Sequence, residues 1–163
     1  MRTELNIAGV LPALLNELID GAAPEAAWVL NPRDPGMLKS LDKLTAEEAS
    51  AIPPGGGASI AAHVDHLCYG LQLLNRWSQG ENPFAGADYT ASWRRTKVSE
   101  EEWASRREIL RREAYLWREA IQCPRDVSEF ELTGMVASVV HLAYHLGAIR
   151  QMNRSIRGPS AED

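Results

Sequence analysis

The chain has 163 residues, of which 45% are hydrophobic and 24% charged, a balance typical of a single globular domain over residues 1–163. Its net charge of -5 argues against a nucleic-acid partner, which would favour a basic surface. The sequence contains no run of roughly eighteen apolar residues, so we predict no membrane-spanning helix. Met1–Glu4 lacks the hydrophobic region of a signal peptide. We therefore expect no membrane partner and a cytoplasmic location.

The first helix is predicted from about Glu4 to Ile19, because apolar residues recur there at helical spacing. Pro12 falls inside this segment and favours a kink or a later start, and Gly21 is suited to end the helix. A connection over residues 22–57 follows. A connection of this length inside a compact domain is usually functional or has structure of its own.

Two short helical segments are predicted within this connection. Met37–Leu44 favours a short helix, and Thr45-Ala46-Glu47-Glu48 is a capping box that begins a further helical turn. The Pro53–Gly57 stretch, which is Pro-Pro-Gly-Gly-Gly, then interrupts the chain.

The second half predicts three longer helices. One begins near Ser59 and runs to Trp77 or Gln79, and the next begins at the Ser99–Glu102 capping box and runs to about Gln122. The last covers about Leu132 to Ser155. No segment alternates with the period of a strand. The fold class is therefore all-α, a four-helix bundle with a long connection between helices one and two.

Charged and sulfur-containing residues point to no further site. Arg106, Arg107, Arg111 and Arg112 alternate with glutamates, which predicts a solvated helix face with i,i+4 pairs. Cys68 and Cys123 lack metal-binding or redox spacing, so we expect no structural disulfide. Cys68 follows His66 by two residues, and either it lies near that histidine or it fills the core.

The histidines carry the strongest functional signal. His141 and His145 are four residues apart on the last predicted helix, so both imidazoles project from nearly the same face, one turn apart. Two such rings can converge on one metal ion, and a third nitrogen from a facing helix would leave a coordination position open for water or substrate. The motif is not HExxH, because Leu142 follows His141. The competing interpretation is a pair of histidines satisfied by ordinary hydrogen bonds.

The third ligand comes from the second main helix, where the spacing leaves two candidates. His63 lies closer to the centre of the apolar stripe of this helix, whereas His66 lies on its flank. Both side chains can point inward, and the periodicity slightly favours His63.

Two segments together resemble the DinB-like (DinB/YfiT-like) metalloenzyme family. They are Ser59–Leu67, which reads SIAAHVDHL, and His141–Gln151, which reads HLAYHLGAIRQ. The resemblance covers most of the chain, including the helix order and the aromatic loop before the third long helix. It implies a four-helix bundle and a metal site formed by His66, His141 and His145, with no ligand role for His63. It also implies zinc or nickel as the divalent transition metal, although imidazole suits copper and iron as well.

Two classes of function are compatible with these features. The resemblance implies a metal-dependent transferase or hydrolase acting on a small molecule, in some relatives a low-molecular-weight thiol, and a homodimer. A bound ion would activate a water or a thiol at neutral pH, but the sequence identifies no catalytic residue beyond the ligands. The alternative is a non-catalytic, stress-linked helical-bundle dimer or ligand-binding module. Tyr69 and Tyr144 flank the histidines and are candidates for orienting their rings. Asp65 also flanks His66, but it is offset from it by about 100° around the helix, so we expect it to face solvent or another helix.

Overall fold

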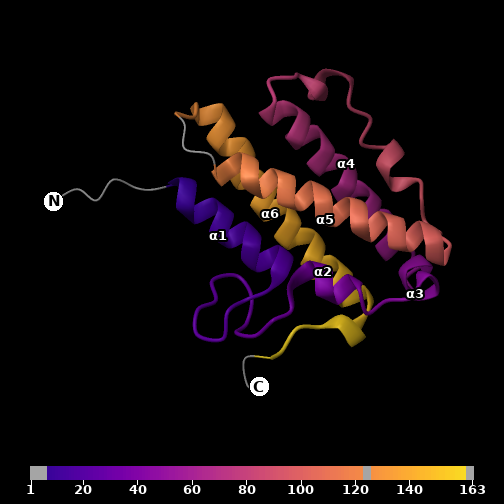
Figure 1. Cartoon of the computed structure of the whole chain (residues 1–163). Helices are drawn as coiled ribbons and strands as arrows, with labels where there is room; N and C mark the ends of the chain where they lie inside the picture. Colours follow the sequence, from indigo (N-terminus) through magenta and orange to yellow (C-terminus); the bar gives the residue numbers. More distant parts are fainter. Residues whose placement is uncertain (1–6, 123–125, 161–163) are drawn as a thin grey trace.

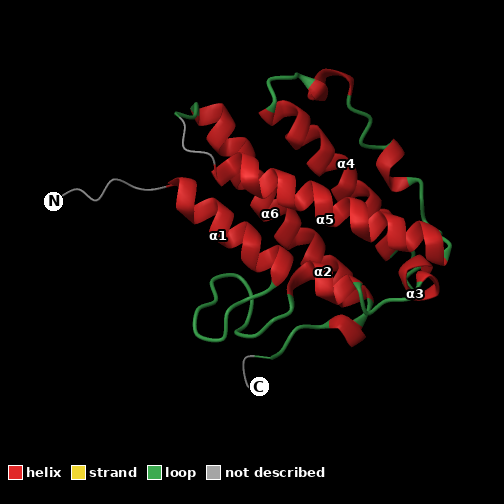
Figure 2. Cartoon of the chain, in the orientation of Figure 1, coloured by secondary structure: helices red, strands yellow, loops and turns green. Residues whose placement is uncertain are grey.

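The computed structural model describes residues 7–122 and 126–160, which form six α-helices and three 3-10 helices with no strand among them (Figures 1 and 2). The all-helical prediction is confirmed for these residues. The α-helices are α1 (Ile7–Asp20), α2 (Gly36–Leu41), α3 (Ala46–Ser50), α4 (Ile60–Ser78), α5 (Glu100–Gln122) and α6 (Glu129–Met152). The 3-10 helices are η1 (Pro83–Gly86), η2 (Ala91–Trp93) and η3 (Arg154–Ile156).

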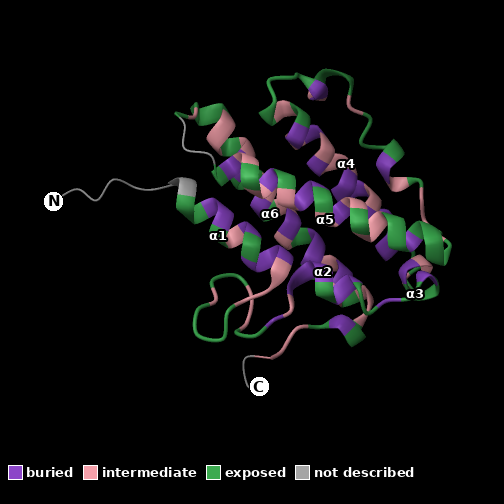
Figure 3. Cartoon of the chain, in the orientation of Figure 1, coloured by how far each residue is buried: buried purple, intermediate pink, exposed green. Residues whose placement is uncertain are grey.

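The four long helices share one hydrophobic core. α5 packs against α1 and α4, and α6 packs against the same two helices. Buried positions gather where these helices face one another (Figure 3). Each fully buried large apolar side chain contributes roughly 1.5–3 kcal/mol relative to its exposed state. The largest of these side chains include Leu15, Leu18, Ile60, Trp103, Trp117 and Ile149.

The long connection between α1 and α4 is ordered by specific contacts. The Glu17 carboxylate of α1 accepts hydrogen bonds from the backbone N–H groups of Trp28, Val29 and Leu30, at 2.7–3.1 Å. Gly21 and Gly36 lie against each other, both with positive φ. A Cβ on either glycine would overlap the backbone of the other segment, so only glycine fits at this crossing.

A buried ion pair joins the connection to α6. Arg150 of α6 forms two hydrogen bonds of 2.7 Å with the Asp34 carboxylate. Asp34 also accepts the Gly36 backbone N–H at 2.8 Å. The side chains are only 3% and 12% exposed for Asp34 and Arg150, so water screens the pair little. The pair therefore fixes the connection against the C-terminal half of α6.

Helix boundaries follow the capping residues. The predicted capping boxes at Thr45 and Ser99 are confirmed, as is the Ser59 cap of α4. α6 begins at Glu129 and not near Leu132, because Ser128 and Glu131 form a capping box that the sequence analysis missed. α6 also ends earlier than predicted, at Met152. The predicted start at Glu4 lies outside the described residues; α1 includes Pro12.

The arginine cluster on α5 pairs differently from the prediction. Most partners come from other elements and not from i,i+4 glutamates. Arg107 and Arg111 both contact Asp42 just after α2, and Arg106 contacts Asp65 of α4. The cluster therefore ties α5 to its neighbours.

One described helix, α6, is long and apolar enough by length and composition to cross a membrane, with a mean hydropathy of 1.4. No such helix was predicted from the sequence, where residues 129–152 contain no uninterrupted run of roughly eighteen apolar residues. This is a weak indication of a span, since core helices meet the same test. Only 33% of the apolar eighteen-residue stretch within α6 is buried. Exposed apolar side chains on α6, here called the exposed α6 face, are Phe130, Val136, Val140 and Tyr144.

Removing the buried carboxylate should destabilise the protein strongly. Asp34→Ala leaves the Arg150 guanidinium buried without its partner, so we expect the free energy of unfolding to fall by about 3–5 kcal/mol. Glu81→Ala breaks the exposed Arg76–Glu81 pair and is the control, with an expected loss below about 1 kcal/mol. Urea unfolding of both variants measures the difference. Equal losses would contradict a structural role for the buried pair.

Candidate metal centre

Four histidines meet where α4 and α6 pack together. His63 and His66 come from α4, and His141 and His145 come from α6. The Nε2 atoms of His66 and His141 are 3.3 Å apart, and those of His141 and His145 are 2.9 Å apart. His66 and His145 are buried, while His141 is partly exposed. The structure thus brings together the three histidines that the family resemblance selected.

Ser92 determines which nitrogen of His66 faces the cluster. The Ser92 hydroxyl donates its proton to the Tyr89 carbonyl oxygen at 2.6 Å. Its oxygen lies 2.8 Å from His66 Nδ1. Because its only proton is used, Ser92 must accept a hydrogen bond from the His66 Nδ1–H. Neutral His66 then carries a lone pair on Nε2, and that lone pair points toward His141.

His63 contacts the cluster from its outer side. Its Nδ1 lies 2.8 Å from Nδ1 of His145, whose Nε2 faces His141. If His145 carries its proton on Nδ1, it donates to His63, and its Nε2 lone pair is directed at the cluster. His63 therefore lies where it can orient a ring of the three-histidine set without belonging to the set.

Trp93 of η2 covers the rings. Its indole stacks on His66 at a centroid distance of 4.3 Å and meets His63 edge-on at 5.1 Å. Neither Ser92 nor Trp93 was predicted from the sequence as a neighbour of the site. They lie in an irregular connection, where no periodicity indicates which way a side chain points. The only available signal was the concentration of aromatic residues there.

The residues that flank the histidines in sequence, Asp65, Tyr69 and Tyr144, differ in what they contact. Asp65 pairs with Arg95 and with Arg106 of α5 at 3.0 and 3.1 Å, so it faces another helix, as its offset from His66 predicts, and anchors the segment after Trp93. Tyr69 accepts the backbone N–H of Asp88 and likewise supports this loop. Tyr144 meets the His145 ring edge-on at 5.2 Å, although it is 68% exposed.

The described cysteine is a core residue. Cys68 is buried, and burial raises the pKa of its thiol to about 12. The thiol is therefore protonated and unreactive at neutral pH. Cys123 lies outside the described residues.

Burial keeps the histidines neutral. Burial, together with the smaller effect of the neighbouring imidazoles, lowers the pKa of His145 to about 3 and that of His66 to about 4. Burial also lowers the pKa of His63 and His141. Neutral imidazole is the form that binds metal ions. The cluster is therefore in its metal-binding protonation state at neutral pH.

The nitrogen separations fit a single ion. With metal–nitrogen distances of about 2.0–2.1 Å, two nitrogens on one ion lie roughly 2.9–3.4 Å apart for the usual coordination angles. The separations of 3.3 and 2.9 Å fall within this range. His66, His141 and His145 could hold a metal ion, since their ligand atoms all lie within 4.8 Å of one another.

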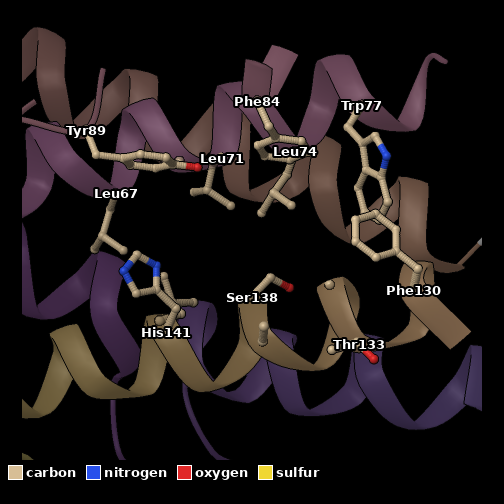
Figure 4. Close-up of a pocket in the computed structure, with 14 residues that line it drawn as sticks. Leu67, Leu71, Leu74, Trp77, Phe84, Tyr89, Phe130, Thr133, Ser138 and His141 are labelled. Atoms are coloured by element: carbon tan, nitrogen blue, oxygen red, sulfur yellow. The ribbon is translucent and has the colours of Figure 1, made fainter. Parts of the chain in front are cut away.

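A groove leads from His141 along the space between α4 and α6. Its volume is about 390 Å³. His141 and Tyr89 lie at one end, and Trp77 and Phe130 lie at the other (Figure 4). The histidine cluster therefore adjoins a space large enough for a small organic molecule.

The metal-free protein should lose stability as the pH falls. The folded-state pKa values of His66 and His145 lie below the unfolded value of about 6.5. Below about pH 6.5 these two histidines therefore bind more protons in the unfolded chain than in the folded protein. The free energy of unfolding that they contribute is fully present above about pH 6.5 and is lost as the pH falls toward 4 for His66 and 3 for His145. We expect a loss of roughly 1–2 kcal/mol per histidine between about pH 6.5 and 5, a range above most carboxylate titrations. Urea unfolding of chelator-treated protein at several pH values measures it, and no change over that range would contradict the prediction.

Comparison with known proteins identifies the family. The sequence model of the DinB superfamily matches residues 35–149, which include all four histidines and the segment that covers them. Searches of curated proteins and of solved structures find no match. The match extends over more than half of the chain, and the chain belongs to the DinB superfamily.

Proposed function

We propose that this protein is a metal-dependent enzyme that acts on a small molecule, with His66, His141 and His145 as the ligands of one divalent transition metal, zinc or nickel. The reaction is a group transfer, with a low-molecular-weight thiol as one candidate substrate, or a hydrolysis. A bound ion of this kind would supply Lewis-acid activation of a water or a thiol. We further propose a single domain over residues 1–163 in which α1, α4, α5 and α6 form a four-helix bundle, and a cytoplasmic location.

The observation that carries the proposal is the convergence of three Nε2 atoms from two helices. Ser92 fixes the tautomer of His66, and His63 is placed to do the same for His145. Partners of this kind orient metal-binding imidazoles in many proteins. Three protein nitrogens are also the ligand number typical of catalytic zinc sites, in which a further position is left for water or substrate.

A hydrogen-bonded cluster without metal is the competing interpretation. A proton on His141 Nε2 could be donated to His145 at 2.9 Å. No proton would then be left for the Nε2 lone pair of His66, which lies 3.3 Å from His141 Nε2. The only alternative is that His66 and His145 share the one proton on His141 Nε2. One ion would satisfy all three lone pairs at once, which favours the metal site.

Substitution of single histidines should separate ligands from supporting residues. We expect His66→Ala and His141→Ala to lose bound zinc, because each removes one of three ligands. His63→Ala should retain zinc with roughly 10–100-fold weaker affinity, the usual cost of losing a partner that orients a ligand. Metal content and affinity are measured on protein prepared without a histidine tag and supplied with zinc, nickel or manganese. Circular dichroism verifies the helical content of each variant.

Two results would contradict the assignment. If His63→Ala empties the site while His66→Ala does not, the ligand on α4 is His63. If the wild-type chain binds none of the supplied metals, the metal-dependent enzyme is excluded in favour of a non-catalytic, stress-linked helical module.

We also propose that the protein is a homodimer that buries the exposed α6 face. Val140 and Tyr144 are 62% and 68% exposed, and Phe130 is 74% exposed. Apolar side chains gathered on one helix face are typical of a protein–protein contact. A symmetric dimer would bring the same face of each copy together.

A charge on this face should produce monomers. Val140→Glu places a carboxylate where the dimer would bury it, which costs far more than the exposed position does. Leu116→Glu, at an exposed apolar residue of α5, is the control. Sedimentation equilibrium should give a dimer for the wild type and for the control, and a monomer for Val140→Glu. A monomeric wild-type protein would exclude the proposed dimer.

A further inference from the structure

We propose that the groove between α4 and α6 binds an uncharged apolar group of the substrate, an alkyl or aryl tail, and thereby places the polar reacting group at the histidine cluster. This inference rests on the proposed function and adds the chemical class of the substrate. It excludes substrates that would carry charge into the groove.

The walls of the groove are hydrophobic along its length. Side chains from α4, η1 and α6 form them together with Tyr89 from the segment after η1, and the ionisable side chains among them, His141 and Tyr89, both lie at one end (Figure 4). Figure 4 shows the leucines of α4 facing α6 across the open space. The principal apolar side chains are Leu67, Leu71, Leu74, Trp77, Phe84 and Phe130.

Two of the three hydroxyl groups in the wall, those of Ser138 and Thr133, are already used within the protein, and the third, that of Tyr89, lies at the His141 end of the groove (Figure 4). The Ser138 hydroxyl accepts from Trp117 Nε1 at 2.8 Å and donates to the Met135 carbonyl at 2.7 Å. The Thr133 hydroxyl donates to the Glu129 carbonyl at 2.8 Å. Beyond the end formed by His141 and Tyr89, a carboxylate or ammonium in the groove would therefore lose its water without gaining partners, which is strongly unfavourable. A tail without polar groups has no such cost.

The end of the groove remote from His141 is an ordered aromatic wall. Trp77 contacts Phe84 and Phe130 at centroid distances of 5.9 and 6.0 Å, and Trp117 at 6.4 Å. Gly134 lets the Trp77 indole approach α6 closely, because a Cβ at position 134 would lie only 3.1 Å from that indole. Flat apolar surfaces held in this way suit an alkyl or aryl group.

Gly70 provides a substitution that fills the groove without disturbing the fold. It lines the groove in the interior of α4, and a Cβ at this position meets nothing within 4 Å. Leucine also has a higher helix propensity than glycine, by roughly 0.8 kcal/mol. Gly70→Leu should therefore fold, bind metal and block the groove. Ala104→Leu, at an exposed position of α5, is the control for adding a leucine elsewhere.

The test measures binding of alkyl hydroxamates to the zinc-loaded protein by calorimetry. Hydroxamates chelate zinc through a small polar head, and the series runs from acetohydroxamate through butano- and hexano- to octanohydroxamate. If the tail enters the groove, affinity should rise roughly threefold to fourfold for each methylene buried. A hydroxamate of the same length that ends in a carboxylate should gain nothing over acetohydroxamate.

The variants separate the groove from the metal. Gly70→Leu should keep the acetohydroxamate affinity and lose the gain with chain length, whereas Ala104→Leu should behave like the wild type. Affinities that do not depend on chain length in the wild type, or a chain-length gain that persists in Gly70→Leu, would overturn the proposal while leaving the metal site intact.

Failure of the metal site itself has a different signature. Metal content is measured first, and its absence overturns the proposed function. The groove is then tested in the metal-free protein with 1-octanol, followed through the NMR shifts of the tryptophan indoles. Binding that Gly70→Leu abolishes supports an apolar site, and no binding overturns it.

Discussion

Four imidazole rings packed at one helix crossing favour their neutral forms, and this constraint organises the site. Charging any of them would bury a cation beside its neighbours, and burial accordingly lowers the pKa of every ring. A neutral imidazole has one donor and one acceptor nitrogen. Ser92 takes the donor of His66, and His63 is in position to take that of His145. The acceptors then face inward, toward a common point.

The neutral cluster depends on segments distant in sequence being held in place. The Ser59 hydroxyl, at the start of α4, donates to the Thr96 carbonyl at 2.7 Å, and Asp65, in the second turn, pairs with Arg95. These two contacts hold the segment that follows Ser92 against α4. The Asp34–Arg150 pair holds α6 one turn beyond His145. These contacts are polar and specific, which suits positioning better than the non-directional packing of the core does.

The sequence predicted the helices and the histidine pair because both depend on local rules. Capping boxes at Thr45 and Ser99, and the four-residue spacing of His141 and His145, need no tertiary information. The choice of His66 over His63 came from the family resemblance, since the apolar stripe of α4 admits both rings. Ser92 and Trp93 could not be predicted from periodicity, because their orientation is set by contacts between a loop and two helices. The earlier start of α6 was predictable, because Ser128 and Glu131 have the capping spacing.

α6 carries three surfaces, and its sequence reflects all of them. One surface buries Leu142 and Ile149 in the core, a second presents His141 and lines the groove, and a third is the exposed α6 face. A helix with apolar residues on several sides lacks the single stripe of an ordinary surface helix, which is why its apolar composition resembles that of a membrane span. Phe130 lies on the exposed face and also lines the groove. A partner that covers this face would therefore contact a side chain that also forms the end of the groove remote from His141.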